Sequence, residues 1–397
     1  MTLTTAAPRR FLLVTLDAAG NWPPERALVR ALLARGHAVR VLSHASHAHV
    51  VRAAGARFEQ YDPSLDVDLS SAPGETATAE RMRVARAVYF NRGYGAALQR
   101  AVETETPDVL LVDQMLLMAS HAAERTGLPT VVLWHTVFAA LAGQLAFPSP
   151  GPADILNAYR ATLGLEPLPA DAIGMGRADA ILAFTWEALD APARPPLPVP
   201  HYIGPLASTT DTTDAAPPAF ALPWAAEDAR PLVLVSFSTS FQNQVATLQR
   251  VADAVAGLPA RVLVTLGPAV TAEALRLPAN AVALPFVPHA AVLPHARLVV
   301  THAGHGTVMA AVTAGVPLVC LPMGRDQHAV AECVRSRGLG RVLAPTAPTH
   351  ELRDAIAAAL ADAPLAAECR RFATTLDVEA GRRRALALLE QVGTAAR

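Results

Sequence analysis

The segment Thr301–Thr307, with the sequence THAGHGT, constrains the fold of this chain more than any other. It follows the apolar, β-branched run Arg297–Thr301, which is typical of a buried strand in a parallel sheet. It precedes the run Val308–Ala314, which is typical of a helix. A strand, a glycine-rich turn and a helix in this order predict an α/β domain built on a parallel sheet.

The turn itself predicts where a ligand binds. A strand-to-helix turn points free backbone N–H groups and the positive end of the helix dipole outward at the carboxyl edge of the sheet, where open α/β folds bind ligands. Gly304 and Gly306 allow a diphosphate to approach the backbone. His302 and His305 can donate hydrogen bonds to its oxygens, and the Thr307 hydroxyl can cap the helix. We expect an anionic ligand here, although such turns also occur merely as tight packing points.

Further elements stand at fixed offsets from this turn. Phe286–His289 lies upstream, Gly315–Pro317 closes the helix and starts the next strand, and Pro322–Gln327 follows that strand as a polar loop. In these residues the chain resembles the inverting nucleotide-sugar glycosyltransferases of the GT-B fold, which include plant and mammalian UDP-glycosyltransferases and bacterial macrolide and antibiotic glycosyltransferases. The resemblance covers the C-terminal half and, more weakly, the N-terminal half. It implies an α/β fold with two Rossmann-like, doubly wound parallel-sheet domains that face a central cleft.

The length of the chain supports two domains, because 397 residues exceed what one core usually holds. Residues 207–229, rich in Thr, Asp and Pro, mark the clearest change of composition and are the predicted linker. The resemblance makes residues 1–206 the acceptor-binding domain and residues 230–380 the nucleotide-sugar-binding domain. Residues 381–397 are predicted to form a C-terminal helix that returns toward the N-terminal domain.

Charge and cysteine content exclude several other classes of protein. The net charge is −1 with charges dispersed along the chain, so we expect no nucleic-acid partner and no membrane-surface partner. The three cysteines, Cys320, Cys333 and Cys369, are too few and too unpatterned for a disulfide framework or a zinc site.

Two apolar segments resemble targeting or membrane sequences. The N-terminal run stops at Asp17 and is better explained as a first strand than as a signal peptide. The longest apolar stretch, residues 130–147, contains His135, Gly143 and Gln144, and divides into a strand and a helix. We therefore expect a cytoplasmic protein, monomeric or homodimeric, without a membrane-spanning segment.

The N-terminal half begins with a βαβ unit. Residues 11–16 form the predicted first strand, residues 23–36 the helix and residues 38–42 the second strand, which implies a parallel sheet. The loop between the first strand and the helix has one glycine, Gly20, where a dinucleotide-binding fingerprint has three, so NAD is disfavoured.

Polar residues end three of the predicted N-terminal strands or follow them directly. Asn21 lies in the first loop, Asp113 ends the strand 109–112, and His135 follows the strand 131–134. Because the carboxyl ends of parallel strands share one edge of the sheet, these side chains are expected to converge on the cleft. The alternatives are that Asp113 caps the next helix and that His135 is a hydrogen-bonded core histidine.

The resemblance also assigns donor contacts. The aromatic ring at Phe286 stacks on the base, the backbone beside Val287 reads it, and the pair Asp326 and Gln327 reads the sugar hydroxyls; these roles suit a nucleotide sugar physically. Hydroxyls at Ser238 and Thr239, with His302 and the turn, meet the diphosphate. The predicted donor-binding residues are therefore Ser238, Thr239, Phe286, Val287, His289, His302, Gly304, His305, Gly306, Thr307, Asp326 and Gln327.

No metal and no cofactor other than the nucleotide sugar is predicted. No Asp-x-Asp is placed to hold a metal on the diphosphate, so the helix end and His302 are expected to stabilise the leaving group. The three histidines within residues 43–49 lack an accompanying carboxylate or cysteine at ligand spacing and are better explained as a solvated loop.

Two positions depart from the pattern of the relatives. Ala310 stands where many plant relatives have a glutamate for the ribose, so a dTDP donor is plausible beside UDP. Asn21 stands where relatives have the histidine that removes the acceptor's proton, oriented by an aspartate that matches Asp113. Asparagine cannot accept a proton at neutral pH, and general-base help is typically worth about a hundred- to ten-thousand-fold.

Three hypotheses follow from Asn21. Asp113 or His135, with Asp17, takes the proton directly while Asn21 orients the nucleophile. Alternatively, the acceptor is a phenol, an enolisable aromatic carbon or a heteroaromatic nitrogen, acidic enough for O-, C- or N-glycosylation. The third is a catalytically silent nucleotide-sugar binder that assists an active glycosyltransferase.

We expect an enzyme, because the donor elements remain nearly complete. The predicted activity is inverting, metal-independent hexosyl transfer from a UDP- or dTDP-sugar to a small aromatic or hydrophobic natural product. The irregular segments 61–80 and 143–176 are expected to select the acceptor.

Overall fold

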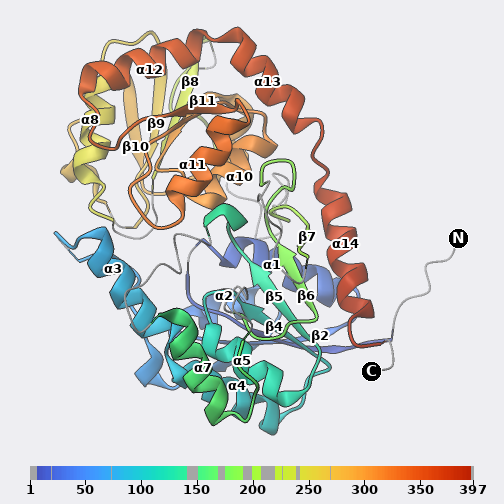
Figure 1. The fold of residues 1–397 in the computed structure, drawn as a ribbon. Helices are drawn as coiled ribbons and strands as arrows, with labels where there is room; N and C mark the ends of the chain where they lie inside the picture. The colour runs from blue at the N-terminus through green and yellow to red at the C-terminus, as the bar shows by residue number, and fades with distance from the viewer. Residues whose placement is uncertain are drawn as a thin grey trace, which may run out of the picture.

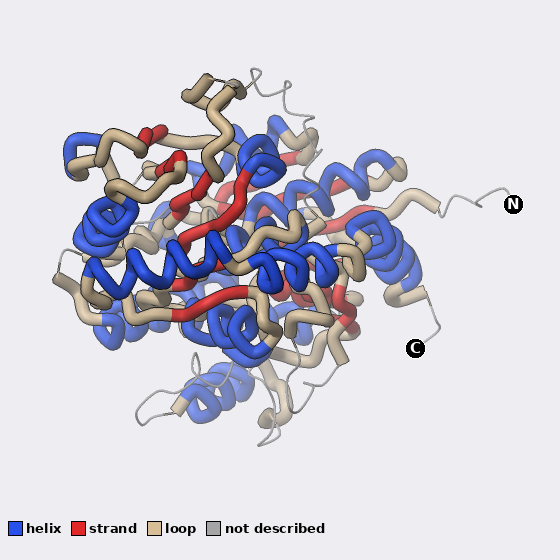
Figure 2. The backbone as a smooth tube through the Cα atoms, turned by 90° about the horizontal axis from the view of Figure 1, so that it is seen from above, coloured by secondary structure: helices blue, strands red, loops and turns tan. Residues whose placement is uncertain are grey.

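The computed structural model describes residues 7–18, 20–72, 74–140, 151–168, 175–190, 199–206, 220–225, 227–237, 242–268 and 270–394. These residues form two lobes, each with a parallel β-sheet between helices (Figure 1). Seen from above, the strands run through the interior and the helices surround them (Figure 2). The predicted α/β architecture with two parallel-sheet domains is confirmed.

The first sheet has seven parallel strands in the order β3-β2-β1-β4-β5-β6-β7. The strands are β1 Arg10–Val14, β2 Ala38–Ser43, β3 Arg57–Gln60, β4 Val109–Asp113, β5 Thr130–Trp134, β6 Ala180–Ala183 and β7 His201–Tyr202. The central strands β4 and β5 are buried along their whole length, which explains their nearly continuous Val and Leu runs. The edge strand β3 was not predicted, because its sequence RFEQ is polar and half-exposed.

The second sheet has six parallel strands in the order β10-β9-β8-β11-β12-β13. The strands are β8 Leu232–Ser236, β9 Arg261–Thr265, β10 Ala281–Leu284, β11 Ala296–Thr301, β12 Leu318–Cys320 and β13 Gly340–Val342. The short edge strand β13 was not predicted either. In both sheets the unpredicted strand lies at an edge, where burial imposes the least apolar pattern.

Helices cover both sheets. Those of the first lobe are α1 Trp22–Ala34, α2 Ala48–Ala53, α3 Ala77–Val84, α4 Arg92–Thr104, α5 Leu117–Thr126 and α7 Pro152–Thr162. Those that follow are α8 Val245–Val255, α9 His289–Val292, α10 His305–Thr313, α11 Gln327–Ser336, α12 Thr349–Ala361, α13 Ala363–Ala373 and α14 Val378–Gln391. None of the described helices is both long enough and apolar enough to cross a bilayer.

Two capped helices, α3 and α4, follow one another with a short π-helical turn between them. Thr76 caps α3 by accepting a hydrogen bond from the backbone of Ala79, so this helix extends into the segment 61–80 expected to be a loop. A π-turn follows at Ala85–Tyr89, and Asn91 then caps α4. The side-chain caps fix these boundaries, and the apolar period alone does not show them.

The last helix, α14, crosses from the second lobe to the first (Figure 1). Leu389 is buried in the same apolar cluster as Leu28 of α1. Arg35 forms an ion pair with Glu390 at 2.9 Å. Gly381 lies so close to the first lobe that a Cβ there would be 2.0 Å from the carbonyl oxygen of Ile203. The chain thus ends on the domain where it began.

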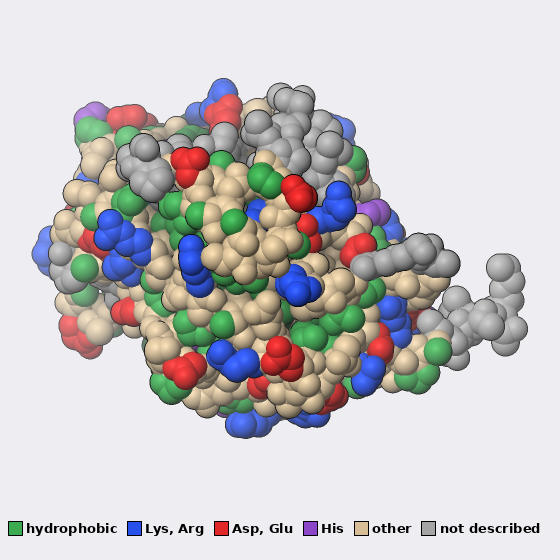
Figure 3. Space-filling view, turned by 60° about the horizontal axis from the view of Figure 1, so that its bottom comes forward, with side chains coloured by type: hydrophobic (Ala, Val, Ile, Leu, Met, Phe, Trp, Pro, Cys, Tyr) green, Lys and Arg blue, Asp and Glu red, His purple; other side chains and the backbone are tan. Residues whose placement is uncertain are grey.

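A second contact joins the lobes directly. Val137 and Trp186 of the first lobe belong to the same buried cluster as Val308 and Met309 of α10. The Trp186 indole N–H donates to the Thr313 hydroxyl at 2.9 Å. Residues 207–219 and 226 of the predicted linker lie outside the described residues. On the face shown in Figure 3, acidic and basic side chains are interspersed.

Candidate active site

A cleft of about 1190 Å³ lies where the carboxyl ends of the strands of both sheets meet. Thirteen of the predicted site residues line it: Asp17, Asn21, His135, Phe286, Val287, His289, His302, Gly304, His305, Gly306, Thr307, Asp326 and Gln327. Asp113 lies behind them, fully buried. Ser238 and Thr239 lie outside the described residues.

The glycine-rich turn opens α10 onto this cleft. Gly304 occupies the N-cap position, so the prediction that the Thr307 hydroxyl caps the helix is wrong. Ala303 has a left-handed φ of 65°, which turns the chain sharply out of β11. The backbone N–H groups of His305, Gly306 and Thr307 therefore belong to the first turn, where an α-helix provides no internal partner for them. This is the geometry of an anion-binding helix end.

The two glycines of the turn do different work. A Cβ at Gly304 would lie 2.6 Å from Nε2 of His302, so glycine is needed there for the histidine to pack. A Cβ at Gly306 would meet nothing within 4 Å, because that position faces open space. Gly306 therefore leaves room for a ligand, while Gly304 leaves room for a side chain.

His302 is buried beside the turn, with its ring stacked on Phe237 at a centroid distance of 5.7 Å. Burial, together with the nearby Arg325 cation, lowers the pKa of His302 to about 4. The ring is therefore neutral at pH 7 and offers one N–H donor. A bound diphosphate would favour the protonated form through its own charge.

His305 contacts the opposite domain. Its Nε2 lies 2.7 Å from the Thr185 hydroxyl, which itself donates to the carbonyl of Thr136. Because the hydroxyl hydrogen is used in that way, Nε2 of His305 is the donor in the first contact. This placement differs from the expected one, in which His305 donates to the diphosphate. Its ring hydrogen instead joins the two lobes.

The residues predicted to read the base lie at the edge of the cleft. Phe286 is 73% exposed, which leaves a ring face open for stacking, whereas Val287 is buried. His289 begins the short helix α9, and its Nε2 lies 3.1 Å from the Ser236 hydroxyl. Burial lowers the pKa of His289.

The predicted sugar-reading pair is divided between two environments. The Thr136 hydroxyl donates to Asp326 across the cleft at 2.5 Å. Gln327 is only 1% exposed; its Oε1 accepts from the backbone of Met323 and Gly324, and its Nε2 donates to Gln242. Asp326 therefore faces the other domain, while Gln327 holds the loop that carries Asp326.

On the acceptor side, Asn21 and Asp113 are in direct contact. The Asn21 amide donates to Oδ2 of Asp113 at 2.7 Å, and the backbone N–H of Met115 donates to Oδ1 at 2.7 Å. Asp113 thus serves both alternatives weighed from the sequence, since it caps the turn before α5 and also faces the first loop. Burial raises the pKa of Asp113 to about 6.

His135 completes this group. Its ring stacks on Phe184 at 4.8 Å, and its Nε2 lies 3.1 Å from Oε1 of Glu25 and 3.7 Å from Oδ2 of Asp113. Its Nδ1 is buried without a hydrogen-bond partner among the described residues. Burial lowers the pKa of His135 to about 4, so the ring is neutral.

Glu25 is the residue that the sequence analysis missed. It lies in the first turn of α1, is completely buried, and receives the Thr15 hydroxyl at 2.9 Å from each carboxyl oxygen. Burial raises the pKa of Glu25 to about 8. A signal was present in the sequence, because Asn21 and Glu25 are four residues apart at a helix start and so lie on one face.

Within the described part of the chain, Glu25, Asp113 and His135 are the only group of three potential metal ligands, with their ligand atoms within 4.8 Å of one another. Their carboxylates already accept hydrogen bonds from Thr15 and Asn21. We therefore interpret the group as a cluster joined by hydrogen bonds rather than by a metal ion.

Asp17 lies at the rim of the cleft and is exposed. Its carboxylate accepts a hydrogen bond from Ser46 at 2.5 Å, and its backbone N–H donates to His44. The structure therefore ties Asp17 to the loop after β2, away from the buried cluster.

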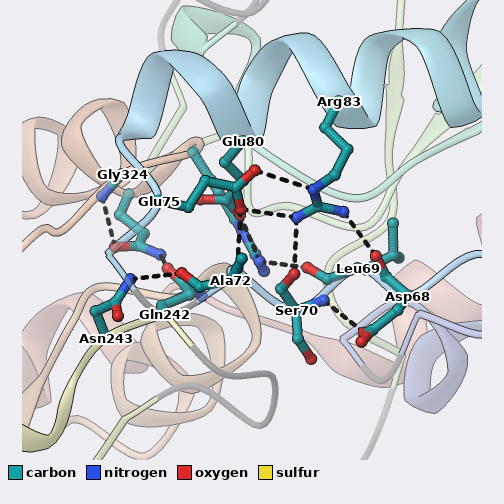
Figure 4. A network of polar contacts seen from close by, with 12 residues as sticks. Asp68, Leu69, Ser70, Ala72, Glu75, Glu80, Arg83, Gln242, Asn243 and Gly324 are labelled. Carbon is teal, nitrogen blue, oxygen red and sulfur yellow. Dashed lines mark hydrogen bonds and ion pairs between the residues drawn. The ribbon is translucent and has the colours of Figure 1, made fainter.

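A polar network closes one side of the cleft (Figure 4). Arg325, beside the predicted sugar reader, pairs with Glu80 of α3 at 2.7 Å and donates to the carbonyl of Leu69 at 2.8 Å. Asn243 of the second lobe accepts from the backbone of Gly74 at 3.2 Å. The segment 68–83 of the first lobe is thus fastened to the second lobe.

Comparison with known proteins adds a finding on the second lobe. Residues 249–379 match the family described as erythromycin biosynthesis protein CIII-like, C-terminal domain. These residues include the turn, the helix α10 and the predicted sugar-reading loop.

Full-length comparisons extend the likeness to both lobes. The chain is 27% identical over 412 residues to oleandomycin glycosyltransferase of Streptomyces antibioticus, covering 98% of this chain and 91% of that protein. Its structure superimposes on the calicheamicin glycosyltransferase CalG4 with a TM-score of 0.79 at 24% identity, covering 98% and 100% of the two chains. The glycosyltransferase VinC, solved in complex with dTDP, gives a TM-score of 0.71 at 22% identity over 96% and 99%.

Proposed function

The chain has the GT-B fold and is a homologue of the macrolide and antibiotic glycosyltransferases, and from this premise we propose that it glycosylates a small natural product. The donor is a UDP- or dTDP-linked hexose, and the acceptor is a hydrophobic, aromatic molecule. The transfer inverts the anomeric centre and yields an O-, C- or N-glycoside without a metal ion.

One observation carries this proposal. The anion-binding turn and Phe286 face the cleft from one domain. Asn21 and the buried cluster behind it face the same cleft from the other domain. Its volume of about 1190 Å³ exceeds the roughly 300–1,000 Å³ of a typical one-ligand pocket. The cleft has room for a nucleotide sugar and an acceptor together.

The donor end of the cleft suits a nucleoside diphosphate. The first-turn N–H groups of α10 and the neutral His302 supply donors for the diphosphate, and the exposed Phe286 ring supplies a stacking face. Ala310, which also lines the cleft, has no polar atom for a ribose 2′-hydroxyl. This favours a donor whose nucleotide contains deoxyribose, such as a dTDP-sugar, in keeping with the dTDP bound to VinC.

The acceptor end presents both polar and apolar side chains. Val67, Leu69, Val84, Met115 and Phe184 line it, so a flat hydrophobic aglycone finds contact area there. The similarity to oleandomycin glycosyltransferase and to the calicheamicin glycosyltransferase CalG4 supports an acceptor of the natural-product class.

The test is a donor and acceptor panel. The protein is incubated with UDP- and dTDP-hexoses and aromatic acceptors, with and without EDTA, and the product is identified by mass spectrometry and its anomeric configuration by NMR. We expect an inverted glycoside at the same rate in EDTA. Loss of activity in EDTA would overturn metal independence. Nucleotide binding without turnover of any donor would instead favour the silent homologue that Asn21 raises as the alternative.

A further inference from the structure

We propose that His135, held by Glu25 and Asp113, is the general base of this enzyme, and that its Nδ1 receives the proton of the acceptor. This inference rests on the proposed glycosyl transfer and deepens it. His135 takes over the role that relatives give to a histidine at the position of Asn21.

The surroundings of the ring determine which nitrogen is free. Nε2 faces two carboxyl groups, Oε1 of Glu25 at 3.1 Å and Oδ2 of Asp113 at 3.7 Å. A neutral imidazole carries one hydrogen, and two acceptors beside Nε2 place it there. Nδ1 then carries the lone pair, and it is the nitrogen without a partner among the described residues. The ring lines the cleft, where an acceptor binds.

Glu25 acts as a positioning residue. Its buried carboxyl keeps a proton at neutral pH. The Thr15 hydroxyl donates to this carboxyl, and its Oε1 accepts the Nε2 hydrogen of His135. In this arrangement Glu25 fixes the tautomer and the plane of the ring, together with the stacked Phe184. It does so without adding a second buried charge.

Asp113 supplies the charge. When Nδ1 takes up a proton the ring becomes a cation, and the Asp113 carboxylate at 3.7 Å is the group that stabilises it. Asn21 donates to that carboxylate at 2.7 Å and so orients it. From the donor domain, His305 is the titratable group whose pKa His135 influences, and its lowered pKa keeps it neutral.

The proton and electron balance is that of an ordinary displacement. The acceptor O–H transfers its proton to Nδ1 as the oxygen forms a bond to the anomeric carbon. The bond from that carbon to the diphosphate oxygen breaks, and the nucleoside diphosphate leaves with the electron pair. The imidazolium then returns its proton to water.

The test uses two phenols of different acidity, 4-methylphenol and 4-nitrophenol, as acceptor probes with the full-length protein. We expect His135→Ala to lower kcat with 4-methylphenol by about a hundredfold or more, and with the more acidic 4-nitrophenol by a much smaller factor. Nucleotide binding should stay within about twofold. His350→Ala, an exposed histidine on α12, is the matched control and should leave both rates unchanged.

The positioning role of Glu25 is tested by comparing a conservative substitution, Glu25→Gln, with an apolar one, Glu25→Leu. Glu25→Gln, whose amide oxygen accepts the same hydrogen, should keep kcat within about fivefold, and Glu25→Leu should lose about tenfold or more. If His135→Ala fails to fold, His135→Gln replaces it. Equal losses with both phenols would show a merely structural role for His135 and overturn the inference alone. No turnover by the wild type with any donor would overturn the proposed function and the inference with it.

Discussion

The Asn21 side chain orients Asp113 but cannot act as a base. Its amide contacts Asp113 at 2.7 Å, at the position where the glycosyltransferases that the chain resembles have a histidine. An amide orients the carboxylate and takes no proton. The loss of a base at this position is therefore compatible with an intact hydrogen-bond geometry around Asp113.

Restoring the histidine is a direct test of this substitution. Asn21→His should place a second base beside Asp113 and raise kcat for weakly acidic aliphatic acceptors by about tenfold or more, since such acceptors depend most on base strength. The measurement is the kcat ratio of an alcohol to a phenol in variant and wild type. An unchanged ratio would mean that proton removal does not limit the reaction.

Glu25 gives the protein a specific pH dependence of stability. The folded state keeps the Glu25 proton up to about pH 8, whereas an unfolded chain loses it near 4.5, so the folded state binds more protons and unfolding becomes easier as pH rises through this window. Asp113 acts in the same direction only up to about pH 6. His135, whose pKa falls from 6.5 to about 4, acts oppositely and only below 6.5.

The window from pH 6.5 to 8 therefore isolates Glu25 within this cluster. Between these limits the wild type should lose roughly 1–2 kcal/mol of unfolding free energy that Glu25→Gln retains. Urea unfolding at both pH values measures the difference. Parallel pH profiles for the two proteins would show that Glu25 is ionised in the folded state.

Gly306 offers a test of the anion-binding turn. Its missing Cβ faces open space, so Gly306→Val fits the fold but fills the volume that a diphosphate needs. Affinity for UDP and dTDP should fall by about tenfold or more, measured by calorimetry. The melting temperature should change little. Unchanged affinity would place the diphosphate elsewhere.

At the level of elements, α3 and the segment before it connect the first lobe to the second. Arg325 and Asn243 both reach this segment, and both have positive φ values, 55° and 54°. Non-glycine residues adopt this backbone region at a cost of about 1 kcal/mol or more. The contacts across the cleft in Figure 4 therefore hold a conformation that the local chain does not favour.

The Glu80–Arg325 pair can be probed by charge exchange. Because the pair is partly exposed, Glu80→Gln should raise the KM for the acceptor only by about two- to fivefold. The exchanged pair Glu80→Arg with Arg325→Glu should recover part of that loss. The exposed Glu368–Arg371 pair on α13 is the control, and Glu368→Gln should leave KM unchanged. If Glu80→Gln leaves the KM for the acceptor unchanged, so that the exchanged pair has no loss to recover, the segment has no role in acceptor binding.

At the scale of the whole molecule, the sequence predicted what local pattern determines. Buried strands such as β4 and β11 are apolar runs, and the turn after β11 carries its own glycines, so both were found. The strands β3 and β13 were not predicted, because these edge strands lack a continuous apolar run. Glu25 was not predicted for another reason, since its partner His135, which directly follows β5, lies 110 residues away in the sequence.

The same distinction holds for His305 and Asp326. Sequence placed both beside the donor, and both do line the cleft, but their hydroxyl partners Thr185 and Thr136 belong to the other domain. Such contacts arise only when the two domains meet. No residue pattern within one domain encodes them.

The docking of α14 makes the two domains depend on each other. Gly381→Ala would normally stabilise a helix by about 1 kcal/mol, but here the added Cβ would meet the Ile203 carbonyl at 2.0 Å. We expect a loss of about 1–3 kcal/mol and a lower melting temperature instead. Gly306 is also a helical glycine, but a Cβ there would face open space, so Gly306→Ala should raise the free energy of unfolding. A stabilising Gly381→Ala would show that α14 shifts freely.

The hydrogen bond from Thr136 to Asp326 uses a carboxylate that is predicted to receive a sugar hydroxyl. A threonine hydroxyl from one domain occupies the carboxylate predicted to receive a sugar hydroxyl in the other. If Asp326 reads the sugar as predicted, donor binding would exchange one alcohol for another, because the sugar would displace Thr136 and release the first lobe from this contact. A sugar hydroxyl in the position of the Thr136 hydroxyl would restore the same hydrogen bond to Asp326, so the Thr136 side chain mimics the group by which the predicted site would select its donor.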